Sequence, residues 1–407
     1  MTPVESELQL TGRGITCVPP DALSTVRTNA VADAAPQGRH SSRPLVVLSP
    51  GFTNARSVLT ALAEDLASHG YVAAGIDHTY ESFATAFPDG RVTTCLARET
   101  PRRGPAFWEK VVTGRAADVS FVLDELTGTR PAGPGAGLID PARIGMAGHS
   151  AGGAAAIAAL LADSRIQAGL DMDGATHAPI PDRGLSRPFL FLGKQANYTP
   201  GGEGSVATWE RDWEFLTGWK RWLLVAGAVH ASFADLALLA DQTGLAIGAG
   251  LPGARSLDIT RAYVRAFFDQ HLRGQPQPLL DHPSPSYPEV TFAGEPDSSG
   301  PQDQPFPADG DGQEGACNPQ QCPEQAGKVS DPAERRCIPG VCAVGHGVAD
   351  AGQQQQPGHS VDNGLFRTVV RVVDNDGQQR DGSRNRDNAE GLADQEKQQH
   401  EKDGRDP

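Results

Sequence analysis

Residues 143–162 read RIGMAGHSAGGAAAIAALLA, and this stretch decides how the rest of the chain is interpreted. The segment Arg143–Ala147 predicts a short strand, and the alanine-rich run Ala151–Ala162 predicts a helix. Between them, GHSAG matches the G-x-S-x-G pattern of a nucleophile elbow, in which glycines let a strand and a helix approach closely. An incidental serine in a glycine-rich turn would not need both flanking elements. The pattern therefore predicts Ser150 as an exposed, activated nucleophile.

Strand and helix patterns alternate on both sides of this elbow. Short apolar runs predict strands, and the amphipathic or alanine-rich segments between them predict helices. This alternation is typical of a mostly parallel sheet, and with the elbow it predicts an α/β-hydrolase fold, with a mostly parallel central sheet and helices on both faces. The predicted strands are Leu45–Leu48, Tyr71–Ile76, Arg143–Ala147, Ile166–Met172, Pro188–Leu192 and Trp222–Val225, and the longer helices are Phe107–Leu126, Ala231–Ala240 and Ser256–Leu272.

A serine hydroxyl needs a histidine to take its proton and a carboxylate to orient that histidine. In this fold the acid follows the serine in the chain, and Asp171 and Asp173 lie at the end of a predicted strand. We favour Asp173 because it lies beside Gly174, where a loop can present its side chain. Asp171 is two residues deeper and would point the same way, so it is either an alternative acid or a partner of a neighbouring helix or cation.

Four histidines follow the candidate acid, and their position relative to the last predicted strand separates them. His230 follows that strand after a short loop, where this fold places its base, so we predict His230 as the catalytic base. We expect His177 to line the site or face solvent, and His271 to lie on a helix surface. His282 is the fourth candidate. His149, the variable position of the elbow, is expected to pack beside the strand.

The negative charge that develops on a substrate carbonyl needs preorganised N–H donors. The amide of Ala151 directly follows the nucleophile at the start of the predicted helix. In this fold the second donor comes from the loop after the first strand, here Ser49-Pro50-Gly51-Phe52, where Gly51 permits a close approach. We therefore predict Phe52 and Ala151 as oxyanion donors, although a plain strand-to-helix turn would have the same residues. This chemistry requires no cofactor and no metal.

Composition divides the chain into a partly ordered N-terminal extension (1–39), a catalytic domain (40–292) and a tail (293–407) rich in Gln, Gly, Asp and Pro. In the tail acidic residues outnumber basic ones, and we expect it to be disordered. The net charge of −15 belongs mostly to the tail, which leaves no basic face for nucleic acid. No stretch approaches the length of a membrane span, although transient contact with a lipid surface remains compatible with the sequence.

Five segments together resemble the platelet-activating-factor acetylhydrolase (isoform II) family. They are Ser49–Phe52, Asp77–Ser82, the GHSAGG elbow, Leu170–Gly174 and Val229–Asp235, and the last, with its His-x-x-Phe-Ala-Asp end, is the most distinctive. The resemblance covers residues 40–292 and implies a serine-dependent, calcium-independent esterase that removes short or oxidised acyl chains from phospholipids. It implies the triad Ser150, Asp173 and His230 and the oxyanion donors Phe52 and Ala151, which are the residues predicted above.

The chain departs from the family pattern at two places near the acyl pocket. The family loop usually reads Ser-His-Gly, where this chain has Ser49-Pro50-Gly51, and the family acid is often followed by an aromatic residue, where this chain has Gly174-Ala175. The acyl preference is therefore open. Relatives often carry a secretion signal, whereas MTPVESELQL lacks a basic n-region and an apolar h-region, so we expect no signal peptide and a cytoplasmic location by default.

Three functions follow from these patterns. The first is a serine esterase or lipase that hydrolyses short-chain acyl esters and is similar to an acetylhydrolase. The second is a broad-specificity carboxylesterase or polyester hydrolase with the same triad. In either enzyme a tryptophan cluster walls the acyl pocket or packs in the core or on the surface. The third is an inactive binding protein whose tail holds zinc. The tryptophans are Trp209, Trp213, Trp219 and Trp222, and the candidate zinc ligands are Cys317, Cys322, Cys337, Cys342 and His346.

Overall fold

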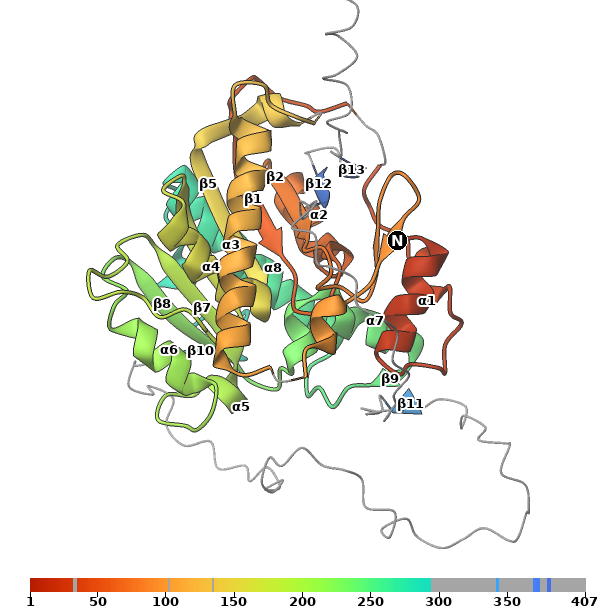
Figure 1. Ribbon diagram of the computed structural model, residues 1–407. Coiled ribbons are helices and arrows are strands. Elements are labelled where there is room, and N and C mark those ends of the chain that lie inside the picture. The colour runs from red at the N-terminus through yellow and green to blue at the C-terminus, as the bar shows by residue number, and fades with distance from the viewer. Residues whose placement is uncertain are drawn as a thin grey trace, which may run out of the picture.

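The computed structural model describes residues 1–31, 35–101, 103–133, 135–293, 342–343, 369–373 and 379–381. Through this part of the chain runs a nine-stranded sheet with the order β10-β8-β7-β6-β5-β1-β2-β12-β13 (Figure 1). Its strands are β1 (Arg43–Ser49), β2 (Val72–Asp77), β5 (Ile139–His149), β6 (Ile166–Met172), β7 (Phe189–Lys194), β8 (Lys220–Val225), β10 (Val290–Phe292), β12 (Val369–Val373) and β13 (Gln379–Asp381).

The central strands are parallel, and the chain changes direction along the sheet at β1. Strand β1 pairs in parallel with β2 on one side and with β5 on the other, and β5 to β8 follow as consecutive parallel neighbours. Strands β10 and β12 are antiparallel to their neighbours β8 and β2. In such sheets a crevice opens at the carboxyl ends of the strands where the order reverses, here between β1 and β5.

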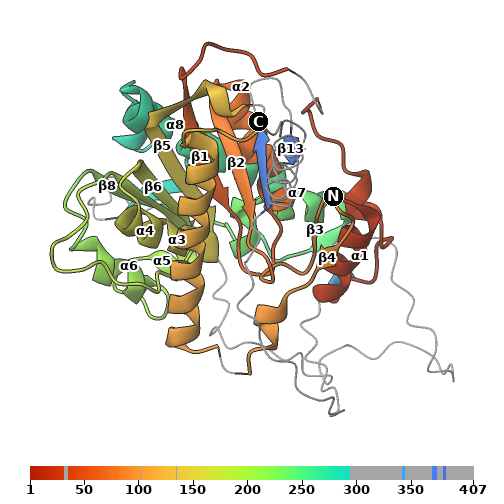
Figure 2. The same cartoon turned by 45° about the horizontal axis from the view of Figure 1, so that its top comes forward.

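Helices cover both faces of the sheet, so the predicted α/β-hydrolase architecture is confirmed. Along β1, Leu45 and Val47 pack with helices α3 and α4, whereas Val46 and Leu48 pack with α2 and α8. Successive side chains of a strand point to opposite faces of the sheet, and helices cover both faces here. Consecutive residues of β1 are therefore all buried. The helices are α2 (Thr60–Ser68), α3 (Pro105–Thr127), α4 (Ala151–Ala162) and α8 (Gly253–Arg273). In Figures 1 and 2, α3 crosses in front of the sheet.

Shorter elements surround this core. The N-terminal helix begins with a capping box in which Thr2 and Glu5 each accept the other's backbone N–H. Two short two-stranded pairs, β3 with β4 and β9 with β11, lie outside the main sheet. These elements are α1 (Pro3–Gly12), α5 (Gln195–Tyr198), α6 (Val206–Trp213), α7 (Asp235–Thr243), β3 (Thr85–Ala86), β4 (Val92–Thr93), β9 (Leu245–Ala246) and β11 (Cys342–Ala343), with 3-10 turns at Ala22–Thr25, Arg56–Leu59, Leu96–Glu99, Ala136–Leu138, His230–Phe233 and Pro278–Leu280.

Beyond Ala293, the segment for which we expect disorder contributes strands β11, β12 and β13 to the described chain. Strand β12 continues the sheet beyond β2, with Val370 opposite Ile76. The rest of this segment lies outside the described residues. The same holds for the zinc hypothesis, because Cys317, Cys322, Cys337 and His346 are not described and only the backbone of Cys342 is.

Phe191 gives a test of the core beneath β6 and β7. Its side chain is fully buried, and its ring lies 5.0 Å from the ring of Phe189 and 4.4 Å from that of Trp209. We expect Phe191→Ala to lower the free energy of unfolding by about 3–5 kcal/mol in urea titrations, because it leaves a cavity. The control Phe121→Ala, on the solvent side of α3, should change it by less than about 0.5 kcal/mol. Equal losses in both variants would contradict this packing.

Candidate active site

Ser150 occupies the turn between β5 and α4 in a backbone conformation that side chains rarely adopt, with φ 57° and ψ −124°. The turn is tight enough to require glycine on both sides. A Cβ added at Gly148 would lie 2.1 Å from the carbonyl carbon of Gly152, and one added at Gly152 would lie 2.0 Å from the carbonyl oxygen of Ser49. The strained conformation therefore persists because the packing of α4 against β1 and β5 determines it.

Ser150, His230 and Asp173 form one chain of hydrogen bonds. His230 Nε2 lies 2.9 Å from Ser150 Oγ, and His230 Nδ1 lies 2.5 Å from Asp173 Oδ2. The other oxygen of Asp173 accepts the Lys194 amide at 2.8 Å. Because a carboxylate only accepts, Nδ1 carries the ring proton and Nε2 is left to accept from the serine hydroxyl. The Asp173 side chain is 1% exposed and that of His230 is 49% exposed, so the acid is enclosed while the histidine faces the site.

Asp171 points elsewhere, although it lies only two residues before Asp173. Strand β6 ends at Met172, and Asp173 has φ 59°, so the two carboxyl groups diverge instead of pointing the same way. The Asp171 carboxyl accepts the Gly174 amide at 2.9 Å and packs on α4, where a Cβ at Gly153 would touch it. Burial raises the pKa of Asp171 well above its usual range. Asp171 is therefore a buried residue beneath the elbow.

The loop after β1 lies directly against Ser150. A Cβ on Gly51 would lie 3.1 Å from Ser150 Cβ, and the Gly51 carbonyl accepts the Asn54 amide at 3.1 Å. Among the described residues, the amides of Phe52 and Ala151 have no hydrogen-bond acceptor. Two unpaired N–H groups beside a serine hydroxyl are the arrangement that an oxyanion needs.

An aromatic cluster flanks the Phe52 side of the site. The Phe52 ring lies 5.8 Å from that of Phe107 and 5.3 Å from that of Trp108, and His177 stacks on Trp108 at 5.3 Å. All four side chains are half-buried, so they offer ring surface to a ligand. Sequence analysis missed Phe107 and Trp108, whose signal was a pair of large aromatics in the first turn of a long helix. Burial is the main cause that lowers the pKa of His177, and the charge of Arg211 adds to it.

The four tryptophans of the predicted cluster pack in or against the core. Trp209 and Trp222 are buried, and the Trp209 indole donates to the Gly174 carbonyl at 2.6 Å. Trp213 and Trp219 are partly buried and pack against the two core clusters. We expected His271 on a helix surface, but it is half-buried against Trp219. Burial lowers its pKa to about 4.

His149, which we expected to pack beside the strand, is buried at the end of β5 and packs beneath His230. Its side chain is 1% exposed, its Nε2–H donates to the His230 carbonyl at 2.8 Å, and the two rings lie 4.6 Å apart. Burial, with a smaller contribution from the charge of His230, lowers the pKa of His149 to about 3. A neutral His149 therefore supports the loop that carries His230.

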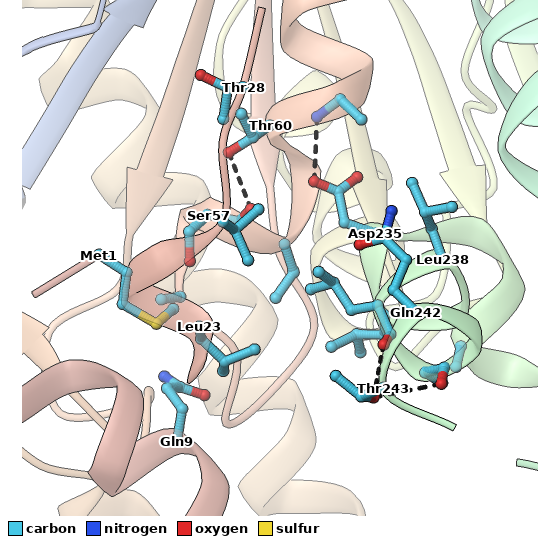
Figure 3. Close-up of a pocket in the computed structure, with 18 of the residues that line it drawn as sticks. Met1, Gln9, Leu23, Thr28, Ser57, Thr60, Asp235, Leu238, Gln242 and Thr243 are labelled. Carbon is cyan, nitrogen blue, oxygen red and sulfur yellow. Dashed lines mark hydrogen bonds between the residues drawn. The ribbon is translucent and has the colours of Figure 1, made fainter. Parts of the chain in front are cut away.

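A cavity of about 410 Å³ lies apart from these groups, between α1, the start of α2 and α7 (Figure 3). Leu23, Leu238 and Thr243 line it, whereas Ser150, Asp173 and His230 do not. At its wall Asp235 accepts the Ala61 amide at 3.1 Å, and burial raises the pKa of Asp235 to about 7.

Neither a metal site nor a membrane-spanning helix is found in the part of the chain that the structure describes. No group of three or more His, Cys, Asp or Glu side chains is arranged to hold a metal ion among these residues. No helix within the described ranges is both long and apolar enough to cross a bilayer.

The buried His149 predicts a pH dependence of stability. The unfolded chain takes up a proton at this histidine near pH 6.5, whereas the folded protein resists it until about pH 3. His149 therefore leaves the free energy of unfolding unchanged above pH 6.5. Below this pH it lowers that free energy by up to about 1.4 kcal/mol per pH unit. Urea unfolding between pH 7 and pH 4 should show a steeper loss for the wild type than for His149→Gln. Parallel curves for the two proteins would contradict a buried neutral His149.

Comparison with known proteins places this geometry in a family. The family model "Platelet-activating factor acetylhydrolase, isoform II" matches residues 15–94 and 136–258. A "Probable 1-alkyl-2-acetylglycerophosphocholine esterase" of Arthroderma benhamiae is 31% identical over 63% of this chain and 67% of its own. A "Platelet-activating factor acetylhydrolase" of Canis lupus familiaris is 26% identical over 56% of this chain and 57% of its own. The chain spans about half the length of the mammalian relatives that it matches.

A solved structure agrees with this assignment. The "Ferulic acid esterase from Streptomyces cinnamoneus" is 45% identical, with a TM-score of 0.60, over 67% of this chain and 79% of its own. The resemblance inferred from the five sequence segments is therefore confirmed. The chain belongs to the platelet-activating factor acetylhydrolase, isoform II, family of carboxylic-ester hydrolases.

Proposed function

We propose that this esterase cleaves short-chain acyl esters by acyl transfer to Ser150, with His230 as the base and Asp173 as the acid that orients it. The hydrogen-bonded chain from Ser150 Oγ through the two nitrogens of His230 to Asp173 carries the proposal. The strained elbow supports it as well, because a serine at φ 57° is held in place only by the surrounding packing. The inactive binding protein, our third hypothesis, would not need this arrangement.

In the first half of the reaction, His230 takes the Ser150 proton at Nε2 while Oγ attacks the ester carbonyl. The imidazolium that forms is stabilised by the buried Asp173 carboxylate, which the Lys194 amide holds in place. The negatively charged carbonyl oxygen then accepts hydrogen bonds from the free amides of Phe52 and Ala151. One such donor typically contributes about 10²–10³ in kcat.

In the second half, the leaving alcohol takes the proton from His230 and departs. A water molecule then approaches the acyl-enzyme, and His230 Nε2 removes its proton as it attacks. The same two amides stabilise the second oxyanion. When this intermediate collapses, the bond between Ser150 Oγ and the acyl carbon breaks, Oγ takes the proton from His230, and the carboxylic acid leaves. Apart from the ester and the water molecule, each group in this proposed cycle is a residue of this chain.

The substrate that we favour is a short acyl ester of a phospholipid. The fungal relative is named for an acetyl ester of an alkyl glycerophosphocholine, and the mammalian relatives are named as acetylhydrolases. A second candidate is a broad carboxylesterase that accepts aromatic esters. The cluster of Phe52, Phe107, Trp108 and His177 favours it, because aromatic side chains stack on aromatic groups, and the solved relative is named a ferulic acid esterase.

A fluorophosphonate probe followed by peptide mass spectrometry tests the nucleophile. We expect the wild type to be labelled at Ser150 and to hydrolyse 4-nitrophenyl acetate, and Ser150→Ala to lose both the label and at least about 10³ in kcat/KM. Parallel assays with a 2-acetyl phospholipid and with methyl ferulate separate the two substrate classes. A phospholipid that is the poorest of the three substrates would favour the broad carboxylesterase. A folded wild type without label and without turnover would refute the proposal.

Two aspartates two residues apart give a matched test of the acid. Asp173→Asn removes the charge that holds the His230 tautomer, so we expect kcat to fall by about 10⁴ at pH 7.5. Asp171→Asn keeps an acceptor for the Gly174 amide and removes a buried carboxyl with a raised pKa. This second variant should keep kcat within about threefold of the wild type and unfold at the same or a higher urea concentration. The reverse pattern would make Asp171 the acid.

A further inference from the structure

A second chain of Ser, His and Asp side chains lies behind the loop that follows β1. His78 Nε2 lies 2.9 Å from Ser49 Oγ, and His78 Nδ1 lies 2.7 Å from Asp118 Oδ2. Ser49 is the last residue of β1, His78 directly follows β2, and Asp118 lies on α3. The hydrogen bonds of this second chain run from serine to histidine to aspartate, in the same order as in Ser150, His230 and Asp173.

The serine and the histidine of this second chain are closed to substrate, whereas the Asp118 side chain is 26% exposed. Ser49 is fully buried and His78 is 2% exposed, whereas the base of the first chain has half of its side chain exposed. Its proton positions are fixed by the partners at its ends. Asp118 accepts from Nδ1–H, and Arg115 Nη1 donates to Ser49 Oγ at 3.3 Å, so the serine hydroxyl donates to His78 Nε2. The chain therefore has a positional role and no nucleophilic one.

Arg115 extends this network to the backbone beside the nucleophile. It is 1% exposed, and its Nη1 donates to the Pro50 carbonyl at 2.5 Å. Its Nε donates to the Glu81 carboxylate at 2.8 Å, and the Glu81 carbonyl accepts the Thr53 amide at 2.8 Å. A buried guanidinium with a carboxylate partner thus holds the loop at Ser49 and Pro50, and Glu81 holds it at Thr53.

Between these constraints the Phe52 amide is unpaired within the part of the chain that the structure describes. The Gly51 carbonyl accepts the Asn54 amide, and in a trans peptide the following N–H, that of Phe52, points to the opposite side. Glycine at 51 keeps this peptide against the serine, because a Cβ there would lie 3.1 Å from Ser150 Cβ. The direction of the Phe52 N–H therefore depends on how firmly residues 49–53 are held.

We propose that Asp118, His78, Ser49 and Arg115 form a positioning network that orients the Phe52 amide toward the oxyanion, so that a second Ser–His–Asp chain affects the rate of the reaction at Ser150. The proposal rests on the proposed function of Ser150 and Phe52. None of the four side chains touches substrate. They act through the loop backbone, because each hydrogen bond removes a rotation that would turn the amide away.

Asp118→Asn is the mild variant that tests the network, and Asp118→Glu is its conservative partner. In the asparagine variant a neutral acceptor faces His78, the tautomer is no longer fixed, and Ser49 loses a defined acceptor. With 4-nitrophenyl acetate we expect kcat to fall about 10-fold with KM within about twofold, since a donor is displaced and not removed. The inhibition constant of a trifluoromethyl ketone, which forms an oxyanion on Ser150, should rise by the same factor. Asp118→Glu keeps a carboxylate, so its kcat and its inhibition constant should stay close to those of the wild type.

Hydrogen exchange of the peptide that spans residues 49–55 gives a readout that needs no turnover. We expect faster exchange in Asp118→Asn and a wild-type rate in Asp118→Glu. The matched control is Asp269→Asn, which removes a carboxylate bonded to Tyr71 and Arg273 on α8. It should lower the unfolding midpoint without changing kcat, the inhibition constant or this exchange rate.

The outcomes separate a failure of the positioning network from a failure of the proposed function. An unchanged inhibition constant in Asp118→Asn, with an active and labelled wild type, overturns the network and leaves the proposed function intact. The same holds if Asp118→Asn and Asp269→Asn lose kcat equally and only in proportion to unfolding. A wild type that neither hydrolyses esters nor reacts with fluorophosphonate overturns the proposed function and the network together.

Discussion

The close approach of the first turn of α4 to strands β1 and β5 is the constraint on which the molecule depends. Gly152 lies so near the Ser49 carbonyl that no side chain fits between them, and Gly148 lies equally near the backbone of Gly152. This contact forces Ser150 into its strained conformation and aligns the free Ala151 amide with the positive end of a buried helix. A longer turn would relax the backbone and separate the nucleophile from the loop after β1.

The sheet order then brings distant segments of the chain to one place. Strands β1 and β5 are neighbours at the point where the order reverses, so the loop after β1 and the elbow after β5 meet at the same edge. Asp173 follows the next strand, β6, and His230 follows β8, two strands further along the sheet. The side chains converge because parallel strands end on one side, and the loops only adjust their final direction.

Sequence analysis predicted the parts of the site that depend on chain order, and it missed the parts that depend on packing across the fold. The elbow, the histidine and the loop after β1 are local patterns, and each lies beside the strand that it was expected to follow. The preference for Asp173 over Asp171 rested on the neighbouring Gly174. The sequence did not reveal that the two carboxyl groups diverge, because this depends on the positive φ at Asp173. Phe107, Trp108 and Arg115 lie on a helix that carries no catalytic motif. Their role is visible only once α3 is placed against the loop after β1.

Helix α3 is therefore more than a cover for the sheet. Phe107 and Trp108 in its first turns flank Phe52, and two turns later Arg115 reaches the Pro50 carbonyl. Trp108, Arg115 and Asp118 are spaced by seven and three residues, so they lie along one face of the helix. This face runs beside the loop after β1, from the Phe52 ring to the buried end of the strand. A ligand that presses on the Phe52 and Trp108 rings thus acts on the same rigid element that holds the Phe52 amide. In the proposed mechanism, the rings that contact the substrate and the amide that faces the oxyanion are therefore supported by the same helix, so that the shape of the bound ester would affect the placement of this amide.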